Sequence, residues 1–169
     1  GNATWHDYDG DGEEDNWEGS GGGILSFQSN LQLNNCKING NTGSGIHCSE
    51  SNISINNCTV GGNQKGGGIW FRDGGYAAIS ECDISNNTGG LGGVYIGTQG
   101  NATIHDCNIL KNTTNNVRGA GIHISGYTNV TVSGCIIEEN TAIADGAGIL
   151  AFGSGLNLAI SQCMIDHNV

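Results

Sequence analysis

The chain has 169 residues and an unusual composition, with 31 glycines, no proline, seven cysteines and only five lysines and arginines, so its net charge is −11. Strong helix formers are too scarce for a helical bundle. Five basic residues are too few to neutralise a phosphate backbone, which argues against a nucleic-acid partner. No apolar run approaches the roughly 20 residues of a transmembrane helix, so we expect no membrane span.

Residues 1–20 form an acidic segment that we expect to belong to the same domain as the rest. Its stretch DYDGDGEEDNWE, residues 7–18, follows the spacing of a 12-residue calcium loop, with a glycine at the sharp turn. The alternative is a solvated acidic loop. The stretch also resembles the loops of EF-hands and thrombospondin type 3 repeats. The pattern predicts that this loop binds Ca²⁺, with the backbone carbonyl of Glu13 and the side chains of the other ligands. The predicted ligands are Asp7, Asp9, Asp11, Glu13, Asp15 and Glu18.

Residues 21–169 contain a repeat marked by six cysteines, with intervals of 22, 24, 25, 28 and 28 residues. Each cysteine lies in a pattern apolar-x-apolar-x-x-Cys-x-apolar-x-x-Asn, as in ISINNCTVGGN. A glycine-rich block such as GGGI or GAGI precedes most of these patterns. Self-similarity at this period is typical of solenoids.

Each repeat contains three period-2 apolar segments, which in the second repeat are 46–48, 53–55 and 58–60. A step of three residues between Ile55 and Cys58 interrupts the alternation and predicts a bend. Three short strands and three bends make one coil of a parallel β-solenoid. The coil buries its apolar face only against its neighbours. We therefore predict an all-β fold of six coils in residues 21–169.

Equivalent positions of the six coils predict columns along the solenoid axis. One glycine stands before each first strand, where we expect no room for a side chain. One asparagine occupies a bend in every coil, where we expect it to tolerate a left-handed conformation and to form an amide ladder. Its members are Asn41, Asn63, Asn87, Asn112, Asn140 and Asn168, and a second column holds Asn30, Asn52, Asn101, Asn129 and Asn157.

The repeated cysteines predict a thiol ladder. Stacked coils bring the Cα atoms to about 4.8 Å, inside the range that a disulfide spans, so vertical pairs such as 36–58, 82–107 and 135–163 are one alternative. We favour buried free thiols because identical rotamers point every sulfur the same way. The spacing lacks the Cys-x-x-Cys pairs of a zinc site.

These motifs resemble the right-handed parallel β-helix of the pectin-lyase-like superfamily. Within it, GGGI or GAGI followed by I-x-x-N or V-x-x-N is most similar to bacterial surface repeats of the polymorphic outer membrane protein type. The resemblance implies a β-helix and, as one alternative, an adhesin. Enzymes of the superfamily use clustered acidic and basic residues, whereas the basic residues of this chain are scattered. We therefore expect no enzymatic activity.

The outward column of the glycine-block strand carries aromatic residues. Trp70 and Tyr95 fall on neighbouring coils and could contact a sugar or pack laterally against another chain. His47 and His123 share that column three coils apart, and we interpret both as solvent-exposed. An ordinary scatter of surface aromatics is the alternative interpretation.

The residue pattern of the last coil continues in the pattern at the start of the sequence. The end of one chain is therefore compatible with the beginning of the next chain in the same coil repeat. This favours a head-to-tail homopolymer, pinned by calcium, as an extracellular or cell-surface structural filament. The first alternative is a segment of a longer carbohydrate-binding adhesin with a surface polysaccharide as partner. The second alternative is a polysaccharide lyase or hydrolase. The sequons that lie outside the ladders, and are therefore candidate glycosylation sites, begin at Asn2, Asn57 and Asn86.

Overall fold

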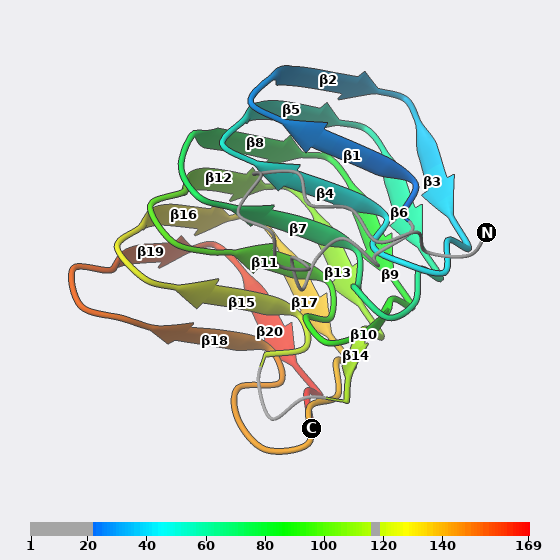
Figure 1. The fold of residues 1–169 in the computed structure, drawn as a ribbon. Coiled ribbons are helices and arrows are strands. Elements are labelled where there is room, and N and C mark those ends of the chain that lie inside the picture. Colours follow the sequence, from blue (N-terminus) through cyan, green and yellow to red (C-terminus); the bar gives the residue numbers. More distant parts are fainter. Residues whose placement is uncertain (1–21, 116–118) are drawn as a thin grey trace, which may run out of the picture.

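The computed structural model describes residues 22–115 and 119–169, and within them every regular element is a β-strand. The chain winds through six coils, each with three strands, as Figure 1 shows. The first strand of each coil joins a parallel six-stranded sheet A, made of β1 (Ile24–Phe27), β4 (Ile46–Ser49), β7 (Ile69–Arg72), β11 (Val94–Ile96), β15 (Ile122–Ser125) and β18 (Ile149–Phe152).

The other two strands of each coil form sheets of the same kind. Sheet B contains β2 (Asn30–Asn34), β5 (Asn52–Asn56), β8 (Tyr76–Ser80), β12 (Asn101–His105), β16 (Asn129–Ser133) and β19 (Asn157–Ser161). Sheet C contains β3 (Lys37–Asn39), β6 (Thr59–Gly61), β9 (Asp83–Ser85), β13 (Asn108–Leu110), β17 (Ile136–Glu138) and β20 (Met164–Asp166). A small pair that the repeat did not predict links two loops, β10 (Thr88–Gly89) and β14 (Thr113–Thr114).

The predicted register is confirmed, since equivalent residues of successive coils face one another, as Ile46 faces Ile69 and Ile55 faces Ile79. Their side chains fill the solenoid interior and are 0–1 % exposed. Phe71 also lies in this core, two residues after Ile69 on the same face of β7. Cys48, which is not one of the six repeated cysteines, is also fully buried.

Left-handed residues produce the bends, but they are not the ladder asparagines. At the bend before sheet A the positive φ belongs to the residue that precedes each asparagine, for example Asn86 (57°), Lys111 (56°) and Glu139 (54°). The expectation that the ladder asparagine itself turns left is therefore wrong. Its side chain is used for hydrogen bonds along the stack, and the preceding residue reverses the chain.

The glycine column is confirmed, and its cause is steric. A Cβ on Gly93 would lie 2.7 Å from the carbonyl oxygen of Gly121 and 2.9 Å from Nδ2 of Asn112. A Cβ on the equivalent glycine of each other coil would lie 3.0 Å or less from the same two kinds of atom. Gly148 is the exception, because of these two kinds only the ladder amide of Asn168 lies that close to its Cβ. The column is glycine because the ladder asparagine and the next coil occupy the space of a side chain.

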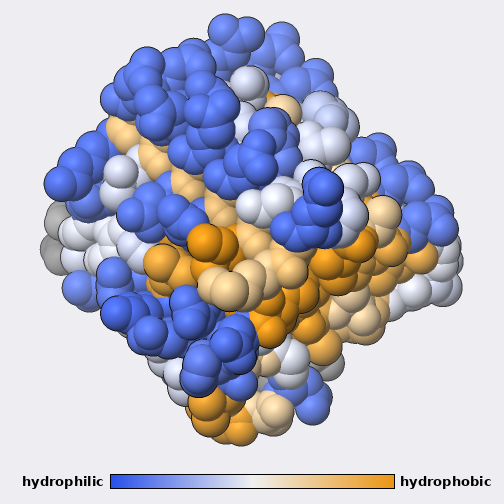
Figure 2. Space-filling model, turned by 180° about the vertical axis from the view of Figure 1, so that it is seen from behind, coloured by the Kyte–Doolittle hydropathy of each residue, from blue (hydrophilic) through white to orange (hydrophobic). Residues whose placement is uncertain are grey.

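The last coil leaves part of its inner face uncovered. Ile160 and Ile165 point inward like Val132 and Ile137 of the preceding coil, yet they are 45 % and 47 % exposed where those two are fully buried. Figure 2 shows a broad hydrophobic patch in the lower half of the molecule, the half that holds the C-terminal coil in Figure 1. No helix in the described part of the chain is long and apolar enough to cross a bilayer.

Candidate functional site

The principal asparagine ladder runs the length of the solenoid at the bend between sheets C and A. From Asn63 on, each Oδ1 accepts both the backbone N–H and the side-chain amide of the asparagine one coil earlier, as Asn140 accepts from Asn112 at 3.0 Å in both bonds. The same amide also donates to a carbonyl of the preceding coil, Ile84 in the case of Asn112 (2.9 Å). Four members are fully buried, namely Asn63, Asn87, Asn112 and Asn140.

The principal ladder is directional, because in each amide-to-amide bond the donor lies one coil closer to the N-terminus than the Oδ1 that accepts it. The second column at the start of sheet B has the opposite sense: Asn129 donates back to Asn101 (2.8 Å) and Asn157 donates back to Asn129 (2.9 Å). Tyr76 interrupts this column, and its backbone N–H donates to Oδ1 of Asn52 (3.1 Å). The second column lies mainly in solvent, so it contributes less stability than the buried one.

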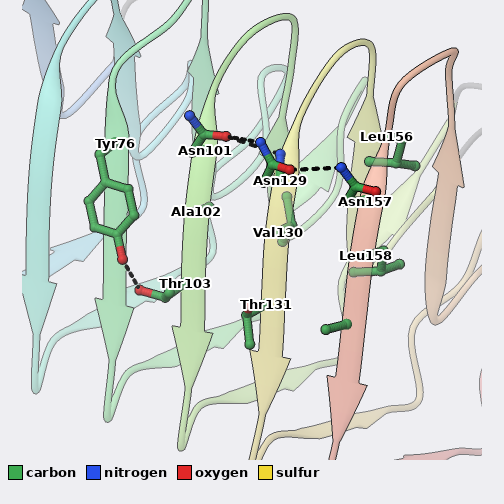
Figure 3. A pocket seen from close by; sticks show the side chains of 11 residues that line it. Tyr76, Asn101, Ala102, Thr103, Asn129, Val130, Thr131, Leu156, Asn157 and Leu158 are labelled. Carbon is green, nitrogen blue, oxygen red and sulfur yellow. Dashed lines mark hydrogen bonds between the residues drawn. The ribbon is translucent and has the colours of Figure 1, made fainter.

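A groove of about 590 Å³ lies over strands β8, β12, β16 and β19. Figure 3 shows the side chains that line it. Amides of Asn101, Asn129 and Asn157, the hydroxyls of Thr103 and Thr131, and Tyr76 are among the groups that line it. The Tyr76 hydroxyl lies 2.9 Å from Oγ1 of Thr103. In each of the six strands of sheet B, the outward positions carry no Asp, Glu, Lys or Arg. The groove offers neutral hydrogen-bonding groups on a strongly acidic protein.

The aromatic column of sheet A is a continuous stack. The rings of His47 and Trp70 are parallel, with centroids 4.4 Å apart, and Tyr95 meets Trp70 edge-on at 6.2 Å. His123 follows at 5.0 Å from Tyr95. Trp70 and Tyr95 are half-buried. The parallel register places one ring above the next, and this column is therefore only a partly open surface.

The expectation that His47 and His123 are solvent-exposed is wrong, since they are 3 % and 5 % exposed. Burial, followed by the charge of Arg72, lowers the pKa of His47 from 6.5 to about 4. The Arg72 guanidinium lies 5.6 Å from the Trp70 ring and is paired with Asp73. His47 is therefore a neutral stacking group at neutral pH.

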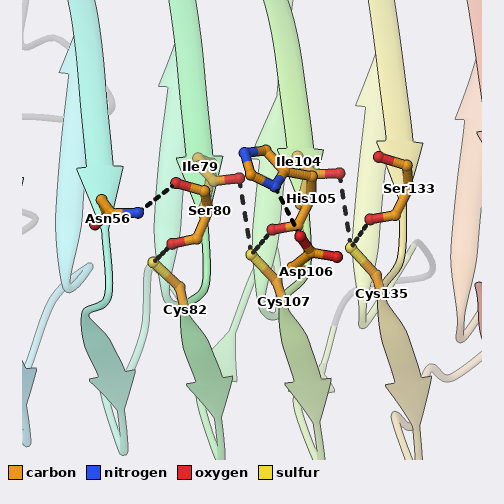
Figure 4. A network of polar contacts seen from close by, with 10 residues as sticks. All are labelled: Asn56, Ile79, Ser80, Cys82, Ile104, His105, Asp106, Cys107, Ser133 and Cys135. Carbon is orange, nitrogen blue, oxygen red and sulfur yellow. Dashed lines mark hydrogen bonds and ion pairs between the residues drawn. The ribbon is translucent and has the colours of Figure 1, made fainter.

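The six repeated cysteines form the predicted ladder, and all are free thiols, as favoured from the sequence. Cys107 and Cys135 each lie 3.2–3.8 Å from two carbonyl oxygens, one two residues earlier and one in the preceding coil. Figure 4 shows these contacts side by side. Contacts with the thiols on both sides and burial raise the pKa of Cys107, while the same contacts lower that of Cys82 and Cys135 to about 7.

Among the described residues, one group has a geometry that could hold a metal. Ligand atoms of Glu138, Asp166 and His167 lie within 4.8 Å of one another at the edge of sheet C. Nδ1 of His167 lies 2.9 Å from a carboxylate oxygen of Asp166, and the group is largely exposed. The predicted calcium ligands Asp7, Asp9, Asp11, Glu13, Asp15 and Glu18 lie outside the described residues, as does Asn2.

Two sequon asparagines can be placed. Asn57 and Asn86 are exposed, both with a left-handed backbone. Asn112 also begins a sequon, but its side chain is fully buried in the ladder.

The family model for the right-handed β-helix region matches residues 14–165. The chain belongs to this family. No curated protein and no solved structure matches the chain significantly. The match supports the parallel β-solenoid predicted from the repeat and the right-handed β-helix that the family resemblance implied, and it is consistent with the pectin-lyase-like superfamily.

The sequence interpretation missed the groove residues Tyr76, Thr103 and Thr131 and the core residue Phe71. Two signals could have found them. Phe71 follows Ile69 with period 2 and so shares its inward face. The outward columns of sheet B lack charge over six coils, although the chain as a whole carries −11.

Proposed function

We propose that this chain is a structural, non-enzymatic subunit that stacks head to tail on further copies to form an extracellular or cell-surface filament. The observation that carries the proposal is the complementarity of the first and last described coils. In the principal ladder each asparagine before the last donates to the next coil, so the last coil offers the backbone N–H of Asn168 and the first coil offers Oδ1 of Asn41.

The hydrogen bonds at the two ends support this pairing. Asn41 donates its amide and its N–H to Asn63, and no donor among the described residues reaches its own Oδ1. At the other end, the Asn168 amide donates to the carbonyls of Ile137 and Asp166, while in the described coils its N–H finds no acceptor. Stacking would bring that N–H to Oδ1 of Asn41 in the next copy.

Apolar burial would add to these bonds. The exposed Ile160 and Ile165 continue inward columns whose first-coil members, Leu33 and Ile38, face the opposite end of the solenoid. Stacking removes the apolar area of these end faces from water, and this burial stabilises the contact by roughly 25 cal/mol for each Å². Because the two end faces differ, the contact is heterologous and propagates without closing.

A pair of single substitutions tests the proposal. Ile165→Arg should block the C-terminal face and Leu33→Arg the N-terminal face, while Tyr127→Arg, on an exposed loop residue, is the control. In sedimentation velocity and negative-stain images, we expect filaments from the unaltered chain and the control. Each blocked variant alone should be monomeric.

Mixing the two blocked variants should give a dimer and nothing larger, because one intact face of each kind remains. Circular dichroism checks that both variants keep their β-structure. If the unaltered chain sediments as a monomer at every calcium concentration, the stacking proposal is wrong.

The second candidate function is carbohydrate binding by a segment of a surface adhesin. The uncharged groove of sheet B supports this function, because amides and hydroxyls bind neutral sugar hydroxyls well. It is a better candidate for the sugar site than the half-buried Trp70 and Tyr95. A glycan array in which binding requires Tyr76 and Asn129 would support this function. Release of reducing or unsaturated sugars would instead favour the lyase or hydrolase alternative.

A further inference from the structure

We propose that oxidation forms a disulfide between Cys163 of one copy and Cys36 of the next, which locks the filament junction covalently. The proposal rests on the head-to-tail stacking proposed above. It assigns to the thiol ladder a role at its two ends, whereas the four central members act only as small core residues.

Access distinguishes the end thiols from the others. Cys58, Cys82, Cys107 and Cys135 are 1–2 % exposed, whereas Cys36 and Cys163 are half-buried. A thiolate can attack an oxidant only where the oxidant can reach it, so the lowered pKa values of the enclosed Cys82 and Cys135 do not suffice for reaction. Burial also raises the pKa of Cys48 to about 12, which removes that thiol from reaction.

The direction of the ladder brings the two end thiols together. From the third coil on, each thiol lies near a carbonyl of the preceding coil, as Cys135 lies 3.6 Å from Ile104 and Cys163 lies 3.7 Å from Val132. The same offset across a junction directs Cys36 of the next copy toward Ile160 of the copy before it. Stacked strands separate the two Cα atoms by about 4.8 Å, within the disulfide range of 4.4–6.8 Å.

A junction is also easier to bridge than the coils within one chain. Inside the chain, each cysteine is fixed between two covalently continuous coils, and its rotamer points the same way as those of its neighbours. Two copies are not joined by a continuous backbone, so a small shift of one copy relative to the other can bring the two sulfurs to about 2.05 Å.

The chemistry requires a small oxidant, which we take to be a low-molecular-weight disulfide such as oxidised glutathione. The Cys163 thiolate attacks it, forming a mixed disulfide and releasing one glutathione thiolate. The Cys36 thiolate then attacks the protein sulfur and releases the second glutathione. Two protein thiols lose two protons and two electrons, and one disulfide reagent becomes two thiols.

The experiment first measures assembly under reducing conditions, which tests stacking alone. A second sample assembles in the presence of oxidised glutathione, while the end thiols of the free chains are still accessible, and is then analysed by non-reducing electrophoresis. We expect a ladder of covalent oligomers from the unaltered chain and from the control Cys107→Ser. Cys36→Ser and Cys163→Ser should each lose every covalent species. Their mixture should give a covalent dimer only, since each supplies the thiol that the other lacks.

The outcomes separate the two proposals. Filaments that form under reducing conditions but yield only monomers after oxidation overturn the disulfide and leave stacking intact. Monomers under both conditions overturn both. Peptide mapping that finds Cys135–Cys163 or Cys82–Cys107 bonds within one chain also overturns the junction disulfide.

Discussion

The amide of Asn112 donates to Oδ1 of Asn140 over 3.0 Å, and both side chains are completely buried. This bond repeats along six coils and joins each turn of the solenoid to the next. Because the core cluster beside the ladder is apolar, every buried polar atom of the ladder depends on its neighbours for a partner. The ladder is therefore both the axial support of the fold and its most vulnerable feature.

Replacing Asn112 by alanine should destabilise the protein by about 3 kcal/mol or more, because the backbone N–H of Asn87 and the carbonyl of Ile84 lose their partners in a dry interior. Chemical denaturation measures the change. The matched control is Asn129→Ala in the exposed ladder, for which we expect less than about 1 kcal/mol. Equal losses in the two variants would contradict the importance of burial.

Gly93→Ala should cost about 1–3 kcal/mol, since its Cβ would lie 2.7 Å from a backbone oxygen that cannot move without displacing the next coil. Gly40→Asn is the control. At that position nothing lies within 4 Å of a Cβ, and asparagine tolerates the φ of 69°. Thermal melts measure the stability of both variants. A lower melting temperature for Gly93→Ala alone would support the steric explanation.

Lowering the pH should destabilise the fold through His47. Its folded-state pKa of about 4 lies below the unfolded value of 6.5, so the unfolded chain binds the proton more readily. Stability is full above pH 6.5, falls by about 3 kcal/mol down to pH 4, and then levels off for this group.

His47→Phe keeps an aromatic ring against Trp70 and cannot titrate. The unfolding free energy of this variant should lack the loss due to His47. The measurement is the difference in unfolding free energy between the variant and the unaltered chain at each pH. The contribution of the carboxylates, which both chains share, cancels in this difference. A His47 imidazole that titrates near 6.5 by NMR would show this prediction to be wrong.

Expression in a host that attaches N-linked glycans should modify Asn57 and Asn86 and leave Asn112 unmodified. The first two side chains are exposed, whereas the third is enclosed by the ladder. Glycopeptide mass spectrometry measures occupancy at all three sites. A glycan on Asn112 would mean that this coil is not packed as described.

Calcium should raise the melting temperature if the loop of residues 7–18 binds it, because a ligand that binds only the folded chain stabilises it. Asp7→Asn together with Asp11→Asn should remove that increase, and Glu50→Gln, an exposed acid in the second coil, should preserve it. Differential scanning calorimetry with and without a chelator makes the comparison. An unchanged calcium response in the double variant would rule out this loop as the site.

The sequence by itself determined the coil, its register and its ladders. A repeat that returns the same residue types every 22–28 positions leaves one parallel register in which Ile55 meets Ile79, and only stacking buries those columns. The cysteine and glycine columns followed from the same alignment. Local patterns suffice here because each coil contacts only its neighbours.

Only the tertiary structure decided what happens at the surface and at the ends. Whether His47 is exposed, which residue of a bend turns left and in which direction each amide points depend on contacts between coils. A single repeat does not contain those contacts. The same holds for the end thiols: Cys36 and Cys107 have equivalent sequence neighbours, and the number of coils stacked on each alone makes one accessible and the other buried.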